Sequence, residues 1–131
     1  MRTLLTIVFT LFATCSFAQT QAEMNQQAFA SYQKVDKELN DVYKKLLTEY
    51  KSDPAFITNL KASQRIWITF RDAELKMKYP EREAGYYGSI HPICRASYLE
   101  ELTSERIKQL RKWLAGVEEV DGCSGSIKLN E

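Results

Sequence analysis

Histidine is almost absent from this sequence, in which His91 is the only one among 131 residues. Neither a C-x-x-C nor an H-x-x-x-H pattern occurs, so the several ligands that a catalytic metal needs are not available. A Ser-His-acid triad would have to use His91 as its base, and the G-x-S-x-G turn that presents the serine is missing. We therefore expect no catalytic residues, no metal site and no cofactor, as is typical of a protein that is not an enzyme.

Paired catalytic carboxylates and phosphate-binding loops are missing too. Asp72 and Glu74 stand two positions apart on one expected helix, so their side chains point in different directions. Residues 85–88 carry two glycines, but the Lys-Ser/Thr pair of a phosphate loop does not follow them. The 18 basic and 17 acidic residues leave a formal net charge of +1, which gives no reason to expect nucleic acid as a partner.

The longest apolar run lies at the N-terminus. Arg2 precedes the apolar residues 4–13, and Ser16 and Ala18 are the small residues that a signal peptidase requires. The run is too short for a comfortable transmembrane span. We predict that residues 1–18 are a signal peptide and that the protein is periplasmic or secreted, without stable insertion into a membrane after cleavage.

Cys15 leaves a lipoprotein alternative open, in which this cysteine becomes the lipidated first residue. Thr14 stands where a lipoprotein signal wants a smaller residue, so we favour a soluble exported protein. Arg2 is the only charged residue in the predicted signal peptide, and its removal leaves equal numbers of basic and acidic residues.

Apolar residues recur every three or four positions in three segments, which predicts three amphipathic helices over residues 24–50, 54–78 and 92–115. Asp53 and Pro54 suit a helix start, whereas Pro80 and Gly116 suit helix ends. Helices of this length with short links favour an all-α fold, an up-down-up three-helix bundle. An ordered loop would join the second and third helices, and a tail would follow residue 115.

The second predicted helix is expected to be the spine of the bundle. Leu60, Trp67 and Phe70, with Ile66 and Ala73 beside them, fall on one side of it. On the third helix the apolar stripe consists of Ile93, Leu99, Leu102, Ile107, Leu110 and Leu114.

Several long or polar side chains accompany these stripes, and a buried polar group must find hydrogen-bond partners. We predict that they form a structural network that ties the second helix, the loop and the third helix together. A ligand clamp formed by Arg71 and Asp72 is the alternative. The predicted network consists of Gln64, Arg71, Asp72, Thr103 and Arg106.

The loop is the main candidate for binding. Its two glycines, aromatic rings, hydroxyl groups and imidazole are typical of a recognition surface on a rigid loop. The alternative is that the tyrosine rings cover the end of the core with their hydroxyls in water. The candidate partner-binding residues are Arg82, Tyr86, Tyr87, Ser89 and His91.

Two cysteines follow the signal segment, and two cysteines in an exported protein predict a disulfide between Cys94 and Cys123. The geometry is tight, because an unbroken helix from Cys94 to residue 115 rises roughly 31 Å at about 1.5 Å per residue. The tail would have to return almost straight along the helix, unless the helix ends early or the bridge joins two chains.

Taken in order, several short motifs resemble the lysozyme inhibitor LprI-like family. They are Met24-Asn25 with Ala28; Asp36 with Leu39-Asn40 and Tyr43; Leu60 with Gln64, Trp67 and Arg71-Asp72-Ala73-Glu74; Gly88-Ser89-Ile90; and Leu102-Thr103 with Arg106 and Leu110. The resemblance implies one exported helical domain over residues 19–131, with its core at 24–115 and its tail at 116–131. At least one member of the family is described as an inhibitor of lysozyme.

The family often has cysteines where this chain has Gln27, Leu75 and Tyr98, so its disulfide scheme must differ here. This departure also predicts that Leu75 and Tyr98 touch across the second and third helices. The resemblance implies an inhibitor of a lysozyme-type muramidase. The composition of the loop adds the hypothesis that inhibition occurs by insertion of this loop into the enzyme's cleft. A non-inhibitory periplasmic interaction or envelope-stress protein that binds another partner is the alternative.

Overall fold

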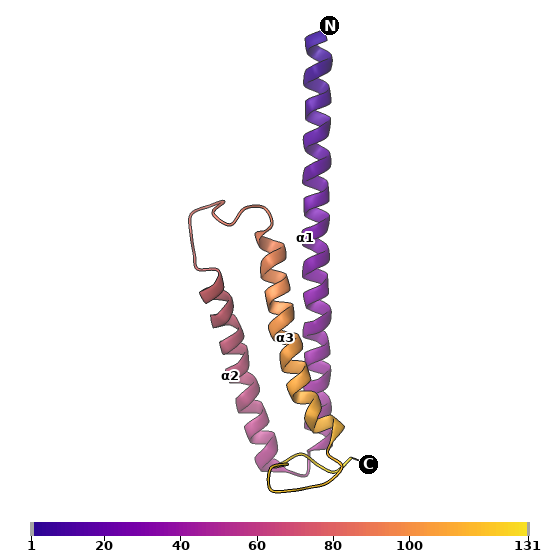
Figure 1. Cartoon of the computed structure of the whole chain (residues 1–131), viewed down its shortest axis with the longest axis vertical. Coiled ribbons are helices and arrows are strands. Elements are labelled where there is room, and N and C mark those ends of the chain that lie inside the picture. The colour runs from indigo at the N-terminus through magenta and orange to yellow at the C-terminus, as the bar shows by residue number, and fades with distance from the viewer. Residues whose placement is uncertain (1, 131) are drawn as a thin grey trace.

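The computed structural model describes the backbone of residues 2–130 and the side chains of residues 20–130. Helices α1 (Arg2–Glu49), α2 (Pro54–Lys78) and α3 (His91–Ala115) run up-down-up and are joined by a tight turn and a longer loop (Figure 1). The predicted all-α bundle is confirmed. The only β-type pairing in the described part is a single bridge between Val117 and Leu129.

Helix α1 begins at Arg2, well before the start predicted at residue 24. Its N-terminal part extends beyond the loop and the other two helices (Figure 1). The predicted signal peptide is this part of the helix, and its side chains lie outside the described residues. No helix in the described part is long and apolar enough to cross a membrane.

The hydrophobic core lies chiefly between α1 and α3, and α2 makes a smaller contact with α3. Leu46 is fully buried, and Tyr50 closes the core at the C-terminal end of α1. Arg111 of α3 also pairs with Glu38 of α1 at 2.6 Å. The buried core cluster consists of Leu39, Val42, Leu46, Tyr50, Leu60, Ile107 and Leu110.

The prediction that α2 is the spine of the bundle is wrong, because α2 lies at the side of the α1–α3 pair. Its inward stripe includes buried Leu60, Gln64 and Leu75. Ile66 and Phe70 are instead 69% and 50% exposed. Leu60 and Trp67 of the predicted stripe do pack in or against the core. The remaining buried positions of α2 are the polar Gln64 and Leu75, which the apolar period alone did not identify.

Two of the buried residues of α3 have small side chains. Ala96 and Thr103 are buried, and Thr103 is completely inaccessible to solvent. The Thr103 hydroxyl donates a 2.6 Å hydrogen bond to the carbonyl of Leu99, one turn earlier in the same helix. Because a threonine in a helix can satisfy its hydroxyl in this way, it can be buried without an external partner.

The helix ends follow the expected chemistry. The Asp53 side chain accepts a 2.9 Å hydrogen bond from the Phe56 backbone N–H, and Pro54 occupies the first turn of α2. Gly116 ends α3 with a φ of 73°. A Cβ atom at Gly116 would lie 2.8 Å from the backbone nitrogen of Asn130, so only glycine fits this turn without displacing the tail.

The C-terminal tail folds under the end of the bundle opposite the loop (Figure 1). The Lys128 ammonium donates a 2.7 Å hydrogen bond to the carbonyl of Glu49 and lies 4.3 Å from the centre of the Tyr50 ring. The Trp113 indole donates a 2.9 Å hydrogen bond to the hydroxyl of Ser126. These contacts tie the tail to both α1 and α3.

The predicted disulfide is not formed. Cys94 and Cys123 are free thiols, the first partly buried and the second exposed. Helix α3 continues unbroken past Cys94 to Ala115, and the tail remains at the far end of the bundle (Figure 1). The tail does not return along α3 as an intramolecular bridge would require.

Candidate functional site: the loop between α2 and α3

Residues 79–90 form an ordered loop held by three consecutive turns. The backbone N–H groups of Tyr86, Gly88 and His91 donate to the carbonyls of Glu83, Gly85 and Gly88, respectively. Gly85 and Gly88 have backbone φ values of 83° and 71°, which residues with a Cβ atom rarely adopt. The glycine spacing therefore fixes the course of the loop.

An aromatic cluster fills the inside of the loop. The rings of Tyr87 and His91 lie 4.5 Å apart, and Tyr79 lies 5.0 Å from His91 and 5.6 Å from Tyr87. The Tyr87 hydroxyl donates a 2.7 Å hydrogen bond to the carbonyl of Pro80. Loss of hydration raises the pKa of the Tyr79 hydroxyl. Tyr87 and His91 therefore support the loop from within, although the sequence predicted them as partner-binding residues.

The outer surface of the loop carries the other predicted residues. Tyr86 is 61% exposed, and its ring lies against both the Tyr87 ring and the Arg82 guanidinium. Ser89 is exposed. Ile90 is also exposed, although it was not among the partner-binding residues predicted from the sequence. Ile90 ends the Gly-Ser-Ile motif, so an apolar residue in an exposed turn was the signal that could have identified it. We call Arg82, Tyr86, Ser89 and Ile90 the loop face.

A hollow of about 400 Å³ lies against the loop and is lined by both acidic and basic residues. Arg95 of α3 and His91 border it. The Nε2 atom of His91 is buried and has no hydrogen-bond partner among the described residues. The structure brings together no group of three or more His, Cys, Asp or Glu side chains that could hold a metal ion, within the part described.

The base of the loop is fixed by contacts between α2 and α3. The Tyr98 hydroxyl donates a 3.1 Å hydrogen bond to Glu74, and the Lys78 ammonium lies 3.7 Å from the centre of the Tyr98 ring. Loss of hydration raises the pKa of the Tyr98 hydroxyl, and its hydrogen bond to Glu74 adds to the effect. Tyr98 thus contacts α2 at Glu74, the residue before the buried Leu75.

The predicted polar network is divided into two parts that meet at Trp67. Arg106 donates to Gln64 at 3.0 Å and thereby joins α3 to α2. Arg71 pairs with Asp72 on its own helix and with Asp36 of α1. Both guanidinium groups lie against the Trp67 ring, at 5.4 Å for Arg71 and 6.0 Å for Arg106.

The network joins the helices without the loop. Its predicted members form no bond to residues 79–90 among the contacts that the structure describes. Thr103 bonds only within α3 and takes no part in either half. The sequence predicted which polar residues have structural partners but not which elements those partners belong to.

The motifs that fix this geometry fall within one family model. A model described as "Lysozyme inhibitor LprI" matches residues 13–110, which include all of α2, the loop and most of α3. The chain belongs to the lysozyme inhibitor LprI family. The loop face of this LprI family protein therefore lies inside the matched region.

The chain is also similar to a Rhizobium meliloti (strain 1021) protein described as uncharacterized. The two are 28% identical over 115 residues, which cover 79% of this chain and 81% of the relative. No solved structure matches the chain. The assignment to the LprI family thus rests on the sequence, and the structure supplies the geometry of the loop.

Proposed function

We propose that this protein is an exported inhibitor of a lysozyme-type muramidase and that the loop face enters the enzyme's cleft. The observation that carries the proposal is the exposed loop face on a rigid aromatic support, in a member of the lysozyme inhibitor LprI family. The inhibitor itself performs no chemistry, and it blocks the cleft by occupying it.

The loop face offers the groups that such a cleft would bind. Lysozyme-type enzymes use a pair of carboxyl groups on either side of the scissile bond. The Arg82 guanidinium can pair with a carboxylate, and the Ser89 and Tyr86 hydroxyls can donate hydrogen bonds to one. Tyr86 and Ile90 add exposed apolar area to the face.

Rigidity of the loop favours tight binding. Ordering a flexible loop on binding costs about 0.5–1.5 kcal/mol for each immobilised side chain with many rotamers. Here the Tyr87 hydroxyl bond to Pro80 and the contact between the tilted rings of Tyr79 and His91 already hold the loop in one conformation. The loop can therefore bind with little further loss of conformational entropy.

A turbidity assay of muramidase activity on bacterial cell walls tests this proposal. The protein without residues 1–18 should inhibit in proportion to its concentration. The double variant Tyr86→Ala with Ser89→Ala should weaken inhibition by about tenfold or more, since central aromatic contacts often contribute at least 2 kcal/mol. Its melting temperature should be unchanged, because both side chains are exposed.

A pair of arginine variants supplies the matched control. Arg82→Ala removes a charge from the loop face, whereas Arg65→Ala removes an exposed charge from α2 outside the loop. Only Arg82→Ala should weaken inhibition. The proposal of a muramidase inhibitor fails if the unaltered protein does not inhibit, and the assignment of the loop face fails if both variants inhibit equally.

A further inference from the structure

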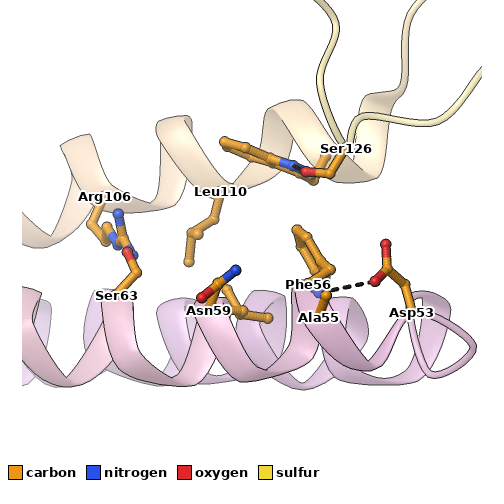
Figure 2. Close-up of a pocket in the computed structure, with 10 residues that line it drawn as sticks. Asp53, Ala55, Phe56, Asn59, Ser63, Arg106, Leu110 and Ser126 are labelled. Carbon is orange, nitrogen blue, oxygen red and sulfur yellow. Dashed lines mark hydrogen bonds between the residues drawn. The ribbon is translucent and has the colours of Figure 1, made fainter.

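The structure contains a groove between α2 and α3 at the end of the bundle opposite the loop. It has a volume of about 390 Å³ and opens to solvent, and its walls are mainly apolar. Phe56 of α2 and Leu110 of α3 lie on opposite walls of it, and Ser126 of the tail lies at one end (Figure 2). This volume is within the range of about 300–1,000 Å³ that is typical of small-molecule sites.

One end of the groove carries a cation without an anionic partner. Arg106 lies there beside Ser63 (Figure 2), and the guanidinium donates only to neutral oxygen atoms of Gln64, Ser63 and Gln109. None of the ion pairs in the described part of the chain includes Arg106. Burial lowers the pKa of the Arg106 guanidinium, because the charge has lost part of its hydration.

The donors at this end are not all used. A guanidinium has five N–H groups, and the three hydrogen bonds of Arg106 leave two of them free. The Ser63 hydroxyl accepts from Arg106 at 2.9 Å, and its own hydrogen makes no bond in the described structure. A carboxylate can accept hydrogen bonds from both groups at once.

The other end of the groove selects against a second negative charge. Asp53 lies there, and one of its oxygen atoms already caps α2 through the Phe56 backbone N–H (Figure 2). Between the two ends, the Trp113 indole nitrogen is satisfied by Ser126, so its ring presents an apolar surface. The groove therefore has a cationic end, a middle that is apolar apart from the Asn59 amide, and an anionic far end (Figure 2).

We propose that this groove binds an apolar monocarboxylate, a medium-chain fatty acid such as octanoate, with its carboxylate on Arg106 and Ser63 and its hydrocarbon chain along Phe56, Leu110 and Trp113. The ionised carboxylate compensates the partly buried charge of Arg106, and the hydrocarbon chain displaces water from the apolar walls. The site is separate from the loop face, so the assignment does not depend on the function proposed for the loop.

Calorimetric titration of the protein lacking residues 1–18 tests this site, with octanoate and 1-octanol at neutral pH as probes. Both molecules should bind, and octanoate should bind about tenfold more tightly, because a charge-assisted bond is roughly twice as strong as a neutral one. Lowering the pH until octanoate is protonated should remove the difference. Equal affinities at neutral pH, or no binding, would overturn the proposal.

Three variants locate the site. Arg106→Gln should abolish the preference for octanoate over 1-octanol, whereas Arg106→Lys should keep part of it and Arg65→Gln all of it. Ala55→Trp adds a large ring to the groove wall without removing a contact, so it should reduce binding of both probes by at least about tenfold.

The assignment to Arg106 is wrong if Arg106→Gln keeps the preference, and the assignment to the groove is wrong if Ala55→Trp binds normally. If Arg106→Gln does not fold, the pH dependence of the unaltered protein and the Ala55→Trp variant still decide the question. A short apolar peptide that binds more tightly through its C-terminal carboxylate than octanoate would also overturn the assignment to fatty acids.

Discussion

The Tyr50 hydroxyl donates a 2.9 Å hydrogen bond to the backbone carbonyl of Trp113, which is 63 positions further along the chain. The same oxygen accepts a 3.3 Å bond from the backbone N–H of Lys128. One buried hydroxyl therefore joins the end of α1 to the end of α3 and to the tail.

Tyr50→Phe should lower the free energy of unfolding by about 1–2 kcal/mol, because it leaves the Trp113 carbonyl and the Lys128 N–H without this partner. Urea denaturation gives the value. Tyr43→Phe is the matched control, since Tyr43 is only partly buried and its hydroxyl makes no bond in the described structure. Equal effects of the two substitutions would show that the Tyr50 bond contributes nothing specific.

Gly116→Ala should destabilise the junction of α3 with the tail by at least about 2 kcal/mol, since its extended backbone with positive φ (φ 73°, ψ −172°) alone costs roughly 1–3 kcal/mol for a residue with a Cβ atom. The added methyl group would also collide with the backbone of Asn130. Gly122→Ala controls for the loss of a tail glycine, because a Cβ there has no atom within 4 Å. Thermal unfolding should separate the two variants, and a Gly116→Ala protein as stable as Gly122→Ala contradicts this prediction.

Arg71→Ala should reduce stability by about 1–2 kcal/mol through the loss of packing on Trp67 as well as of ion pairing. The Arg71 side chain is 14% exposed, whereas its partners Asp36 and Asp72 are 39% and 54% exposed, so solvent screens the pairs. High salt should remove only part of the effect. An Arg65→Ala protein serves as the exposed control, and identical melting temperatures of the two variants would refute a structural role for Arg71.

Asp121 should make the tail turn dependent on pH. The Ser124 hydroxyl, followed by the backbone N–H groups of Cys123 and Ser124, holds the pKa of the Asp121 carboxyl below its ordinary 3.8. The folded state therefore binds a proton less readily than the unfolded chain. The stabilisation is complete above the ordinary pKa and is lost as the pH falls through the depressed value.

The pH-dependent shift of the Cys123 and Ser124 amide NMR signals should accordingly be centred below the ordinary Asp pKa of about 4. In Asp121→Asn the same signals should not respond to pH in this range. A titration of the unaltered protein centred at or above the ordinary pKa would contradict the depressed value.

Cys123 should react with a thiol reagent faster than Cys94, because Cys123 is exposed and Cys94 is partly buried in the first turn of α3. Mass spectrometry of the native protein lacking residues 1–18 after alkylation should find two modified cysteines. A mass two hydrogens lower, with no alkylation, would establish the disulfide that composition alone favours.

The sequence predicted the helix boundaries well where a chemical signal marks them. Pro54, Pro80 and Gly116 restrict the backbone whatever surrounds them, and the observed ends of α2 and α3 lie at or near them. Which residues of α2 face the core could not be fully predicted. Gln64 counts as polar in any hydrophobic pattern, but it is buried because Arg106 satisfies its side-chain oxygen. Such a bond depends on a residue 42 positions away.

The candidate loop was likewise predictable only in part. Composition identified residues 79–92 as an irregular, aromatic loop, but it could not tell that Tyr87 points inward and Tyr86 outward. That difference arises from the turns at Gly85 and Gly88. The groove at Arg106 left no local signal at all, since its walls come from α2, α3 and the tail.

The packing of α3 on α1, with α2 at the side, also has a kinetic consequence. The core joins segments that are far apart in the chain, so α1 and α3 must meet by closing a long loop that contains all of α2. Folding should therefore be slower than in a bundle whose neighbouring helices pair in sequence. Once formed, the α1–α3 pair should exchange its amide hydrogens more slowly than α2, because α2 contributes only Leu60 to the buried core cluster.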